Sequence, residues 1–334
     1  MSVSAVKHPQ SSLTPRQLYR ARLLDTLRVH LGPRLCDALE QPDLTDLVVN
    51  ADGQVWVHEH STAWSPLRAR LPADTVESII STVASIAGAV VNAEQPELEA
   101  EFPLDGSRFT ATLAPVSHAA PVLAIRRLCE RVFTLDEYVA AGRLTNEAAQ
   151  YLREVVRAKQ NILIAGAMGS GKTTLGNALL HELEVAPDAA RERVIIIEDT
   201  VELRCEVPNR VAFRTSARFS LHDALRMALR YAGTRIIVGE VRGAEAHDLL
   251  KAMNTGHPGA ITTLHANSAE EALDRLGDLV AEANVPINRR LIARAINVIV
   301  YMTRTPSGPS VGEVVRVTGC TDTGWSFDRP AFSF

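Results

Sequence analysis

The chain has 334 residues, of which 46% are hydrophobic and 22% are charged. This length exceeds the roughly 100–200 residues of one ordinary domain, and the composition is too apolar for disorder, so we predict two globular domains. The formal net charge of -4 argues against a chain that coats nucleic acid non-specifically. The sequence has no run of ~18 apolar residues, which predicts a soluble, cytoplasmic protein, peripherally associated with a membrane at most. Widely spaced cysteines predict neither a zinc site nor a disulfide framework: Cys36, Cys129, Cys205 and Cys320.

The first part of the chain has the pattern of a small α+β domain. After a polar tail at residues 1–15, leucines at helical spacing predict a helix over 15–39, broken near Gly32-Pro33. An Asp-Gly turn at 52–53 predicts a β-hairpin, and a core-facing helix is expected over 76–91. Residues 1–130 should therefore form an α+β domain with an antiparallel sheet. Its predicted strands are 46–50, 54–58, 108–113 and 122–127.

The second part of the chain alternates helical segments with short, continuous apolar runs. Residues 129–136 are the predicted linker, and 137–334 the predicted second domain. Continuous apolar strands separated by helices indicate a buried, mainly parallel sheet, so we expect an α/β domain. The predicted strands are 161–165, 194–197, 235–238, 260–264 and 298–301.

A phosphate-binding loop is predicted between the strand at 161–165 and the helix that follows. Such a loop needs glycines that let backbone N–H groups surround phosphate oxygens, a lysine for the β- and γ-phosphates, and a hydroxyl for Mg²⁺. All three are present, so we expect ATP and Mg²⁺ as cofactors. The predicted binding residues are Gly166, Ala167, Met168, Gly169, Ser170, Gly171, Lys172, Thr173 and Thr174, with Thr173 holding the metal.

Carboxylates follow the next two apolar runs. Glu198, with Asp199 and Glu202 close behind, is a candidate to hold Mg²⁺ directly or through water, and a charged turn is the alternative. Glu240 follows the run at 235–238 after Gly239 and is the candidate for polarising the attacking water; a solvated acid at a strand end is the alternative.

A histidine follows the run at 260–264. His265, with Thr262 and Thr263, is a candidate to contact the γ-phosphate or the catalytic water. His257, which follows Thr255 and Gly256, is a weaker candidate. For both histidines the alternative is a structural role.

The order of these motifs resembles the secretion traffic ATPases. The P-loop, Ile-Ile-Glu198-Asp199-Thr200, Ile-Ile-Val-Gly-Glu240-Val-Arg-Gly and Thr-Gly-His257 to His265-Ala-Asn match the Walker A motif, Asp box, Walker B motif and His box of that family. Within it, the segment 253–268 and the short first domain are most similar to the conjugative type IV secretion branch. The turn 231–234 departs from the family's usual Arg-Pro-Asp-like sequence.

The resemblance implies a RecA-like P-loop domain and a hexameric ring with ATP between the two domains. Arg108 and Arg126, and less strongly Arg127, stand at positions similar to the family's arginines that reach the phosphates. Such arginines would supplement Lys172, because developing phosphate charge is usually countered by an additional arginine. Three arginines of the second domain are alternative partners for the acids: Arg226, Arg230 and Arg242.

The resemblance predicts an Mg²⁺-dependent ATP hydrolase that acts on the cytoplasmic face of the inner membrane. Its implied partners are further copies of itself, inner-membrane components of a secretion channel and companion ATPases, without direct nucleic-acid binding. A type IV pilus or type II secretion motor is the alternative within the family. A RecA-like nucleic-acid motor and a nucleotide-gated scaffold with negligible turnover are the alternatives from other classes.

Overall fold

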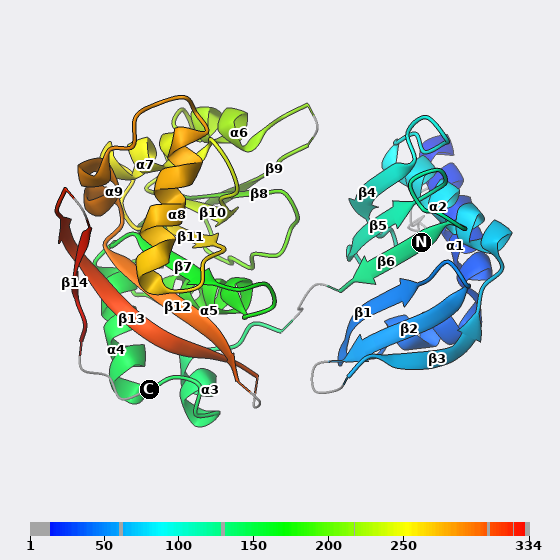
Figure 1. Ribbon diagram of the computed structural model, residues 1–334, viewed down its shortest axis with the longest axis horizontal. Coiled ribbons are helices and arrows are strands. Elements are labelled where there is room, and N and C mark those ends of the chain that lie inside the picture. Colours follow the sequence, from blue (N-terminus) through cyan, green and yellow to red (C-terminus); the bar gives the residue numbers. More distant parts are fainter. Residues whose placement is uncertain are drawn as a thin grey trace, which may run out of the picture. The chain divides into compact units, whose positions relative to one another are not determined.

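The computed structural model describes residues 14–59, 63–127, 131–216, 218–305, 308–322 and 324–330. The chain divides into two compact units, Met1–Leu128 and Cys129–Phe334 (Figure 1). Of the predicted polar tail at 1–15, only Thr14 and Pro15 lie within the described residues, and Pro15 already begins a helix. Among the described residues, no helix combines the length and the apolarity needed to cross a membrane.

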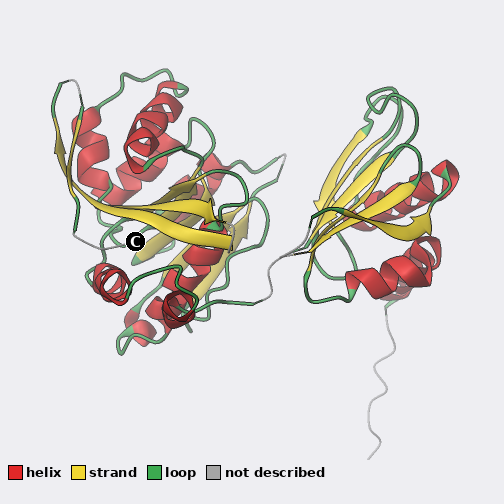
Figure 2. Ribbon diagram, turned by 60° about the horizontal axis from the view of Figure 1, so that its bottom comes forward, coloured by secondary structure: helices red, strands yellow, loops and turns green. Residues whose placement is uncertain are grey.

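The first unit is built on a six-stranded sheet in the order β3-β2-β1-β6-β5-β4, and all its pairings are antiparallel. Two helices pack on one face of this sheet (Figure 2). The α+β prediction with an antiparallel sheet is therefore confirmed. The strands are β1 (Leu44–Val49), β2 (Gln54–Glu59), β3 (Ser65–Arg70), β4 (Glu97–Glu101), β5 (Arg108–Thr112) and β6 (Val122–Arg126).

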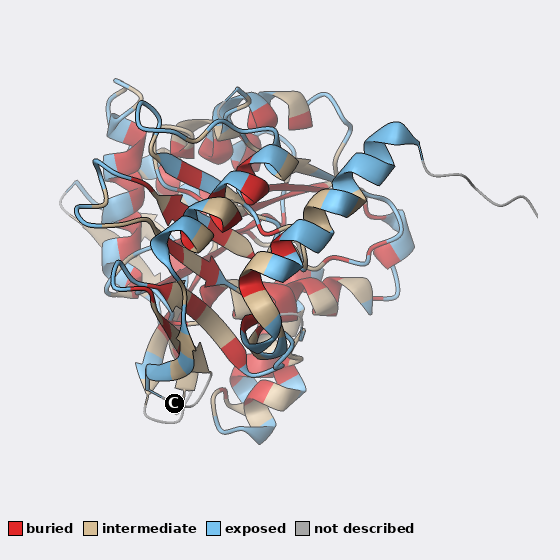
Figure 3. Cartoon of the chain, turned by 90° about the vertical axis from the view of Figure 1, so that its right-hand side faces the viewer, coloured by how far each residue is buried: buried red, intermediate tan, exposed pale blue. Residues whose placement is uncertain are grey.

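The two helices of the first unit are α1 (Pro15–Leu39) and α2 (Ala73–Ala87). A capping box at Thr14 starts α1, and Gly32 breaks it with a φ of 70° and an extended ψ of 167°, as predicted. The first turns of α1 are exposed, and its leucines become buried only from Leu27 onward (Figure 3). The predicted end of the second helix at residue 91 is wrong. Gly88 ends α2 in the left-handed conformation, and Val90 lies exposed beyond it.

Sequence patterns missed β3 and β4, which form the two edges of the first sheet. β4 alternates glutamate with apolar residues, and β3 contains Pro66 and two arginines. Charged side chains and proline are common on edge strands because they discourage pairing with another chain. The same residues weaken the apolar pattern from which a strand is predicted.

The second unit contains an eight-stranded sheet in the order β14-β13-β12-β7-β11-β10-β8-β9. The strands from β12 to β9 pair in parallel, whereas β13 and β14 add an antiparallel extension. A mainly parallel sheet was predicted, and it is confirmed. The strands are β7 (Ile162–Gly166), β8 (Val194–Glu198), β9 (Arg210–Arg214), β10 (Arg235–Glu240), β11 (Ile261–Leu264), β12 (Val298–Thr305), β13 (Gly308–Cys320) and β14 (Trp325–Asp328).

Both faces of the second sheet are covered. Along β7, Leu163 and Ala165 pack with one group of helices, and Ile162 and Ile164 pack with the other. This burial on both faces explains why the central strands read as continuous apolar runs. The helices are α3 (Leu135–Ala140), α4 (Asn146–Arg157), α5 (Lys172–Glu184), α6 (Leu221–Ala228), α7 (Ala246–Asn254), α8 (Ala269–Ala281) and α9 (Arg289–Ala295), with a short 3-10 helix at Ala189–Arg191.

Candidate active site

The loop between β7 and α5 has the backbone of a phosphate cradle. Its glycines take φ values of 155° at Gly166, 70° at Gly169 and 86° at Gly171, which L side chains rarely adopt. A Cβ on Gly166 would lie 2.6 Å from the carbonyl oxygen of Met302, and one on Gly171 would lie 2.7 Å from Pro309 Cβ. The loop is therefore fixed against β12 and β13. It leads into the N-terminus of α5, where backbone N–H groups favour an anion.

Lys172, the first residue of α5, is folded back onto this loop. Its side-chain ammonium donates to the carbonyl oxygens of Gly166 and Ala167, both at 3.0 Å. Lys172 is only 8% exposed, and burial lowers the pKa of its ammonium. The lysine is therefore held at the loop by neutral carbonyl groups, which a phosphate oxygen can replace.

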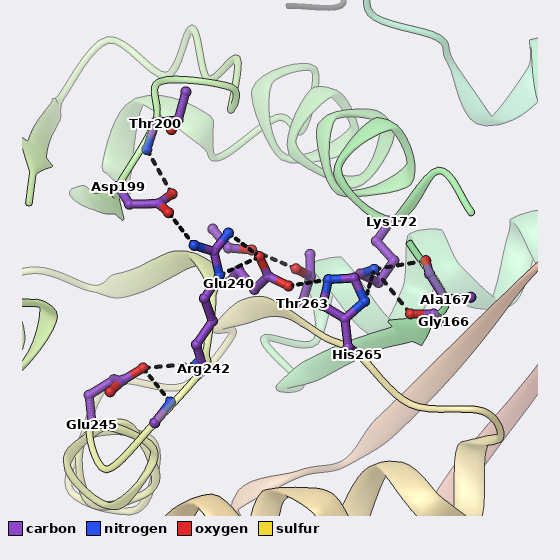
Figure 4. Close-up of polar contacts among 12 residues, drawn as sticks. Gly166, Ala167, Lys172, Asp199, Thr200, Glu240, Arg242, Glu245, Thr263 and His265 are labelled. Atoms are coloured by element: carbon purple, nitrogen blue, oxygen red, sulfur yellow. Dashed lines mark hydrogen bonds and ion pairs between the residues drawn. The ribbon is translucent and has the colours of Figure 1, made fainter. Parts of the chain in front are cut away.

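His265 connects Lys172 with Glu240 at the carboxyl edge of the sheet (Figure 4). Nδ1 of His265 lies 3.1 Å from Lys172 Nζ, and Nε2 lies 2.8 Å from Glu240 Oε1. Burial, followed by the nearby Lys172 cation, lowers the pKa of this imidazole. A neutral imidazole suits Lys172, because Nδ1 can then accept from the ammonium, while Nε2 is close to Glu240 Oε1 without a hydrogen-bonded geometry.

A β-bulge positions Glu240 at the end of β10. Val238 pairs with Thr262 and Glu240 pairs with Thr263, so Gly239 is an extra residue in the ladder. The hydroxyl of Thr263 donates to the carbonyl oxygen of Gly239 at 2.8 Å. Thr263 therefore supports the bulge that positions Glu240.

Arg242 holds the second oxygen of Glu240. Its Nε and Nη2 donate to Glu240 Oε2 at 2.8 and 2.5 Å, and its Nη1 donates to Asp199 Oδ2 at 2.7 Å (Figure 4). Oε1 of Glu245 fixes the loop by accepting from the backbone N–H groups of Arg242 and Gly243. Of the arginines considered as partners for the acids, Arg242 has this role. The loop contact of Glu245 was not predicted, although its place three residues after Arg242 is a signal for such a turn.

Glu198 ends β8, the neighbour of β10, and is only 5% exposed. Its Oε1 accepts from the backbone N–H groups of Glu202 and Leu203, at 2.9 and 2.7 Å. Burial raises the pKa of Glu198 to about 7, against the effect of these two hydrogen bonds. A Cβ on Gly239 would lie 3.3 Å from Glu198 Cγ. The absence of a side chain at Gly239 therefore lets the ends of β8 and β10 approach each other. Oε2 of Glu198 takes part in neither of the two backbone hydrogen bonds.

Other predicted residues are placed by their elements. Thr173 and Thr174 are half-buried in the first turn of α5, and Ser170 Oγ is buried without a hydrogen-bond partner among the described residues. In the first unit, Arg108 and Arg126 stand opposite each other in the β5–β6 register. Arg126 is paired with Asp46 at 2.8 Å and remains 55% exposed.

The structure separates the two histidines of the predicted His box. α7 returns the chain from the carboxyl edge of β10 to the opposite edge, where β11 begins. There Gly259 lies against Arg235, the first residue of β10, whose Nη1 is 3.5 Å from the Gly259 carbonyl oxygen. His257 precedes this point and is therefore not at the edge that carries His265. The two residues of the motif flank β11, and a role of His257 at the phosphates stays an untested prediction.

The unusual turn at 231–234 also lies at that opposite edge. The Tyr231 carbonyl oxygen accepts from Arg193 Nε at 2.7 Å, and the Thr234 hydroxyl donates to the buried Glu192 at 2.5 Å. Glu192 is further paired with Lys159 and Arg235. The turn is therefore anchored at the amino edge of β10, away from the P-loop.

The chain belongs to the family described as Type II/IV secretion system protein, whose model matches residues 35–321. It is 38% identical over 296 residues to the probable conjugal transfer protein TrbB of Sinorhizobium fredii, which covers 89% of this chain and 90% of that protein. It is 34% identical over 269 residues to the type IV secretion system protein PtlH of Bordetella pertussis, covering 71% and 77%. The family predicted from the motifs is confirmed, including the similarity to conjugal transfer proteins.

The fold is shared with a solved structure, the pilus retraction motor PilT with bound ADP. That structure matches with a TM-score of 0.61 at 20% identity, covering 88% of this chain and 80% of PilT. At this identity the match concerns the fold, and it confirms the α/β assignment.

Proposed function

We propose that this chain is an ATP hydrolase that powers assembly of, or substrate transfer through, a conjugative type IV secretion system. The observation that carries the proposal is the contact chain from Lys172 through His265 to Glu240 beside the P-loop. It places a candidate phosphate-binding cation and a candidate water-orienting carboxylate at one sheet edge. The conjugal context is supported by the similarity to TrbB.

The residues present fit ATP and Mg²⁺. The loop glycines give a backbone cradle without Cβ atoms, and the buried hydroxyl of Ser170 lacks a partner among the described residues. Bound ATP supplies the phosphoanhydride, and Mg²⁺ offsets the charge of its phosphates. The Thr173 hydroxyl and the second oxygen of Glu198 are the proposed metal-holding groups. Lys172 would exchange its two carbonyl contacts for phosphate oxygens.

Glu240 is the proposed water-orienting residue. In phosphoryl transfer, positioning of the attacking water contributes more than strong basicity, so an ionised carboxylate is sufficient. Arg242 holds the carboxylate of Glu240 in place by donating twice to Oε2. His265, next to both Lys172 and Glu240, is suited to report movement of the lysine to the carboxylate.

Arg108 and Arg126 are the proposed additional cations for the phosphates, acting in a homohexameric ring on the cytoplasmic face of the inner membrane. Their facing positions on β5 and β6 support a joint role, because one anion can meet both. Inner-membrane channel proteins and companion ATPases are the proposed partners, without direct nucleic-acid binding.

The test is Mg²⁺-ATP turnover against protein concentration, with mass followed by light scattering. We expect turnover to rise as hexamers form, and Arg108→Ala and Arg126→Ala to lower it at equal hexamer content. Arg70→Ala, in the same unit but on β3, is the control. A fully active monomer would contradict the ring, and strong salt-dependent stimulation by DNA would favour a nucleic-acid motor instead.

A further inference from the structure

The hairpin of β12 and β13 continues beyond the sheet edge alongside the P-loop. The last residue pair between β12 and β7 is Met302 with Gly166, yet β12 runs on to Thr305. On the β7 side, residues after Met302 therefore flank the loop, while β13 still pairs with them on the other side. Met302 and Pro309 hold the hairpin close to the P-loop, because a Cβ on Gly166 would collide with Met302 and a Cβ on Gly171 with Pro309.

Arg304 lies in this extension. A Cβ on Gly169 would be 3.6 Å from Arg304 Nη1, so the guanidinium is next to the middle of the phosphate loop. The side chain of Arg304 is exposed and makes no hydrogen bond or ion pair with any residue that the structure describes. Arg242, in contrast, is occupied by Glu240 and Asp199. Arg304 thus offers an uncommitted cation at the loop.

The strand order fixes the side from which Arg304 approaches. β7 lies between β11, which leads to His265, and β12, which carries Arg304. Glu240 is on β10, beyond β11 on the same side as His265. Arg304 therefore faces the loop from the side away from the candidate hydrolytic residues.

Resting on the proposed function, the geometry points to Arg304 as a nucleotide-binding residue that contacts the diphosphate portion shared by ATP and ADP. A guanidinium donates to phosphate oxygens through a rigid fork and keeps its charge at every physiological pH. An interaction made equally with substrate and product lowers the dissociation constant without accelerating hydrolysis. Arg304 would therefore set affinity, while Glu240 sets turnover.

The test is equilibrium binding of fluorescently labelled ADP to the full chain in Mg²⁺, with turnover at saturating ATP measured in parallel. Arg304→Ala should raise the dissociation constant for ADP and for ATP by similar factors of about 10 to 100, the range for hydrogen bonds to charged groups. Its kcat should stay within about threefold of the wild type. Arg304→Lys, which keeps the charge and loses the fork, should give an intermediate dissociation constant.

The matched control is Arg316→Ala. Arg316 is an exposed arginine on β13 that pairs with Val298, the first residue of β12, and so lies at the far edge of the same sheet. Unchanged ADP affinity in Arg304→Ala, or a loss of kcat at unchanged affinity, would overturn the inference. Failure of the wild type itself to bind ADP would instead overturn the proposed function. If Arg304→Ala is unstable, Arg304→Lys decides between these outcomes.

Discussion

Nε2 of His265 lies 2.8 Å from Oε1 of Glu240. Glu240 ends β10 and His265 directly follows β11, at the same sheet edge. The other ring nitrogen faces Lys172, so one imidazole touches both the phosphate-loop cation and the candidate water-orienting carboxylate. Substitution of His265 therefore tests both contacts at once.

Replacing His265 with asparagine should lower kcat by about 10- to 100-fold, within the range for groups that position a reacting proton or water. ATP affinity should change much less, because the P-loop cradle does not include the imidazole. His257→Asn is the matched control from the same sequence motif, and its kcat should equal that of the wild type. Steady-state turnover with separate binding measurements checks both. Equal losses in the two variants would contradict the placement of His265 alone at the site.

The ion pair between Asp199 and Arg242 should contribute little to stability, because the two side chains are 47% and 54% exposed. A double-mutant cycle with Asp199→Asn and Arg242→Gln, read by urea unfolding, should give a coupling below about 1 kcal/mol. Turnover should nevertheless fall about tenfold in Arg242→Gln, since Glu240 loses the guanidinium that donates twice to its Oε2. Arg230→Gln, which removes another exposed arginine of the second unit, serves as the control. A large coupling with unchanged turnover would assign Arg242 a purely structural role.

Glu198 should make stability depend on pH. Its pKa is raised to about 7 by burial, whereas an unfolded carboxyl titrates near its model value of 4.5. Between these values the folded protein holds a proton that the unfolded chain has released, so stability must fall as pH rises from about 4.5 to 7. The loss is at most about 3 kcal/mol.

Glu198→Gln mimics the protonated form and should remove this dependence. The difference in free energy of unfolding between wild type and variant, measured by urea unfolding from pH 4.5 to 8, should change across that window and level off above pH 7. A difference that is flat from pH 4.5 to 8 would show that Glu198 titrates normally in the folded state.

Gly259→Ala should destabilise the second unit although it lies at the edge opposite the P-loop. Gly259 has a φ of 79°, and a Cβ there would lie 2.3 Å from Arg235 Nη1. The expected cost is about 2–4 kcal/mol, from backbone strain together with displacement of a buried arginine. Gly256→Ala isolates the strain, since its φ is 106° with nothing within 4 Å of the new Cβ. Thermal unfolding of both variants would contradict the argument if Gly256→Ala were equally costly.

The sequence predicted those features that short local patterns encode. Strands buried on both faces, such as β7 and β8, are continuous apolar runs, and the glycines and lysine of the P-loop stand in one short segment. Edge strands such as β4 escaped prediction because charged residues interrupt their pattern.

Contacts that depend on the sheet as a whole could not be read from the sequence. The approach of Arg304 to the P-loop depends on how far β12 extends past β7. That extension leaves no local signal in the residues concerned.

The most direct test of the account compares nucleotide binding and hydrolysis in Lys172→Ala, Glu240→Gln and wild type. Glu270→Gln, an exposed acid at the start of α8, is the control. The account predicts that Glu240→Gln binds Mg²⁺-ATP like the wild type but hydrolyses it at least about 100-fold more slowly, while Lys172→Ala loses binding as well. Wild-type turnover in Glu240→Gln would contradict the assignment of the carboxyl-edge site as the centre of ATP hydrolysis.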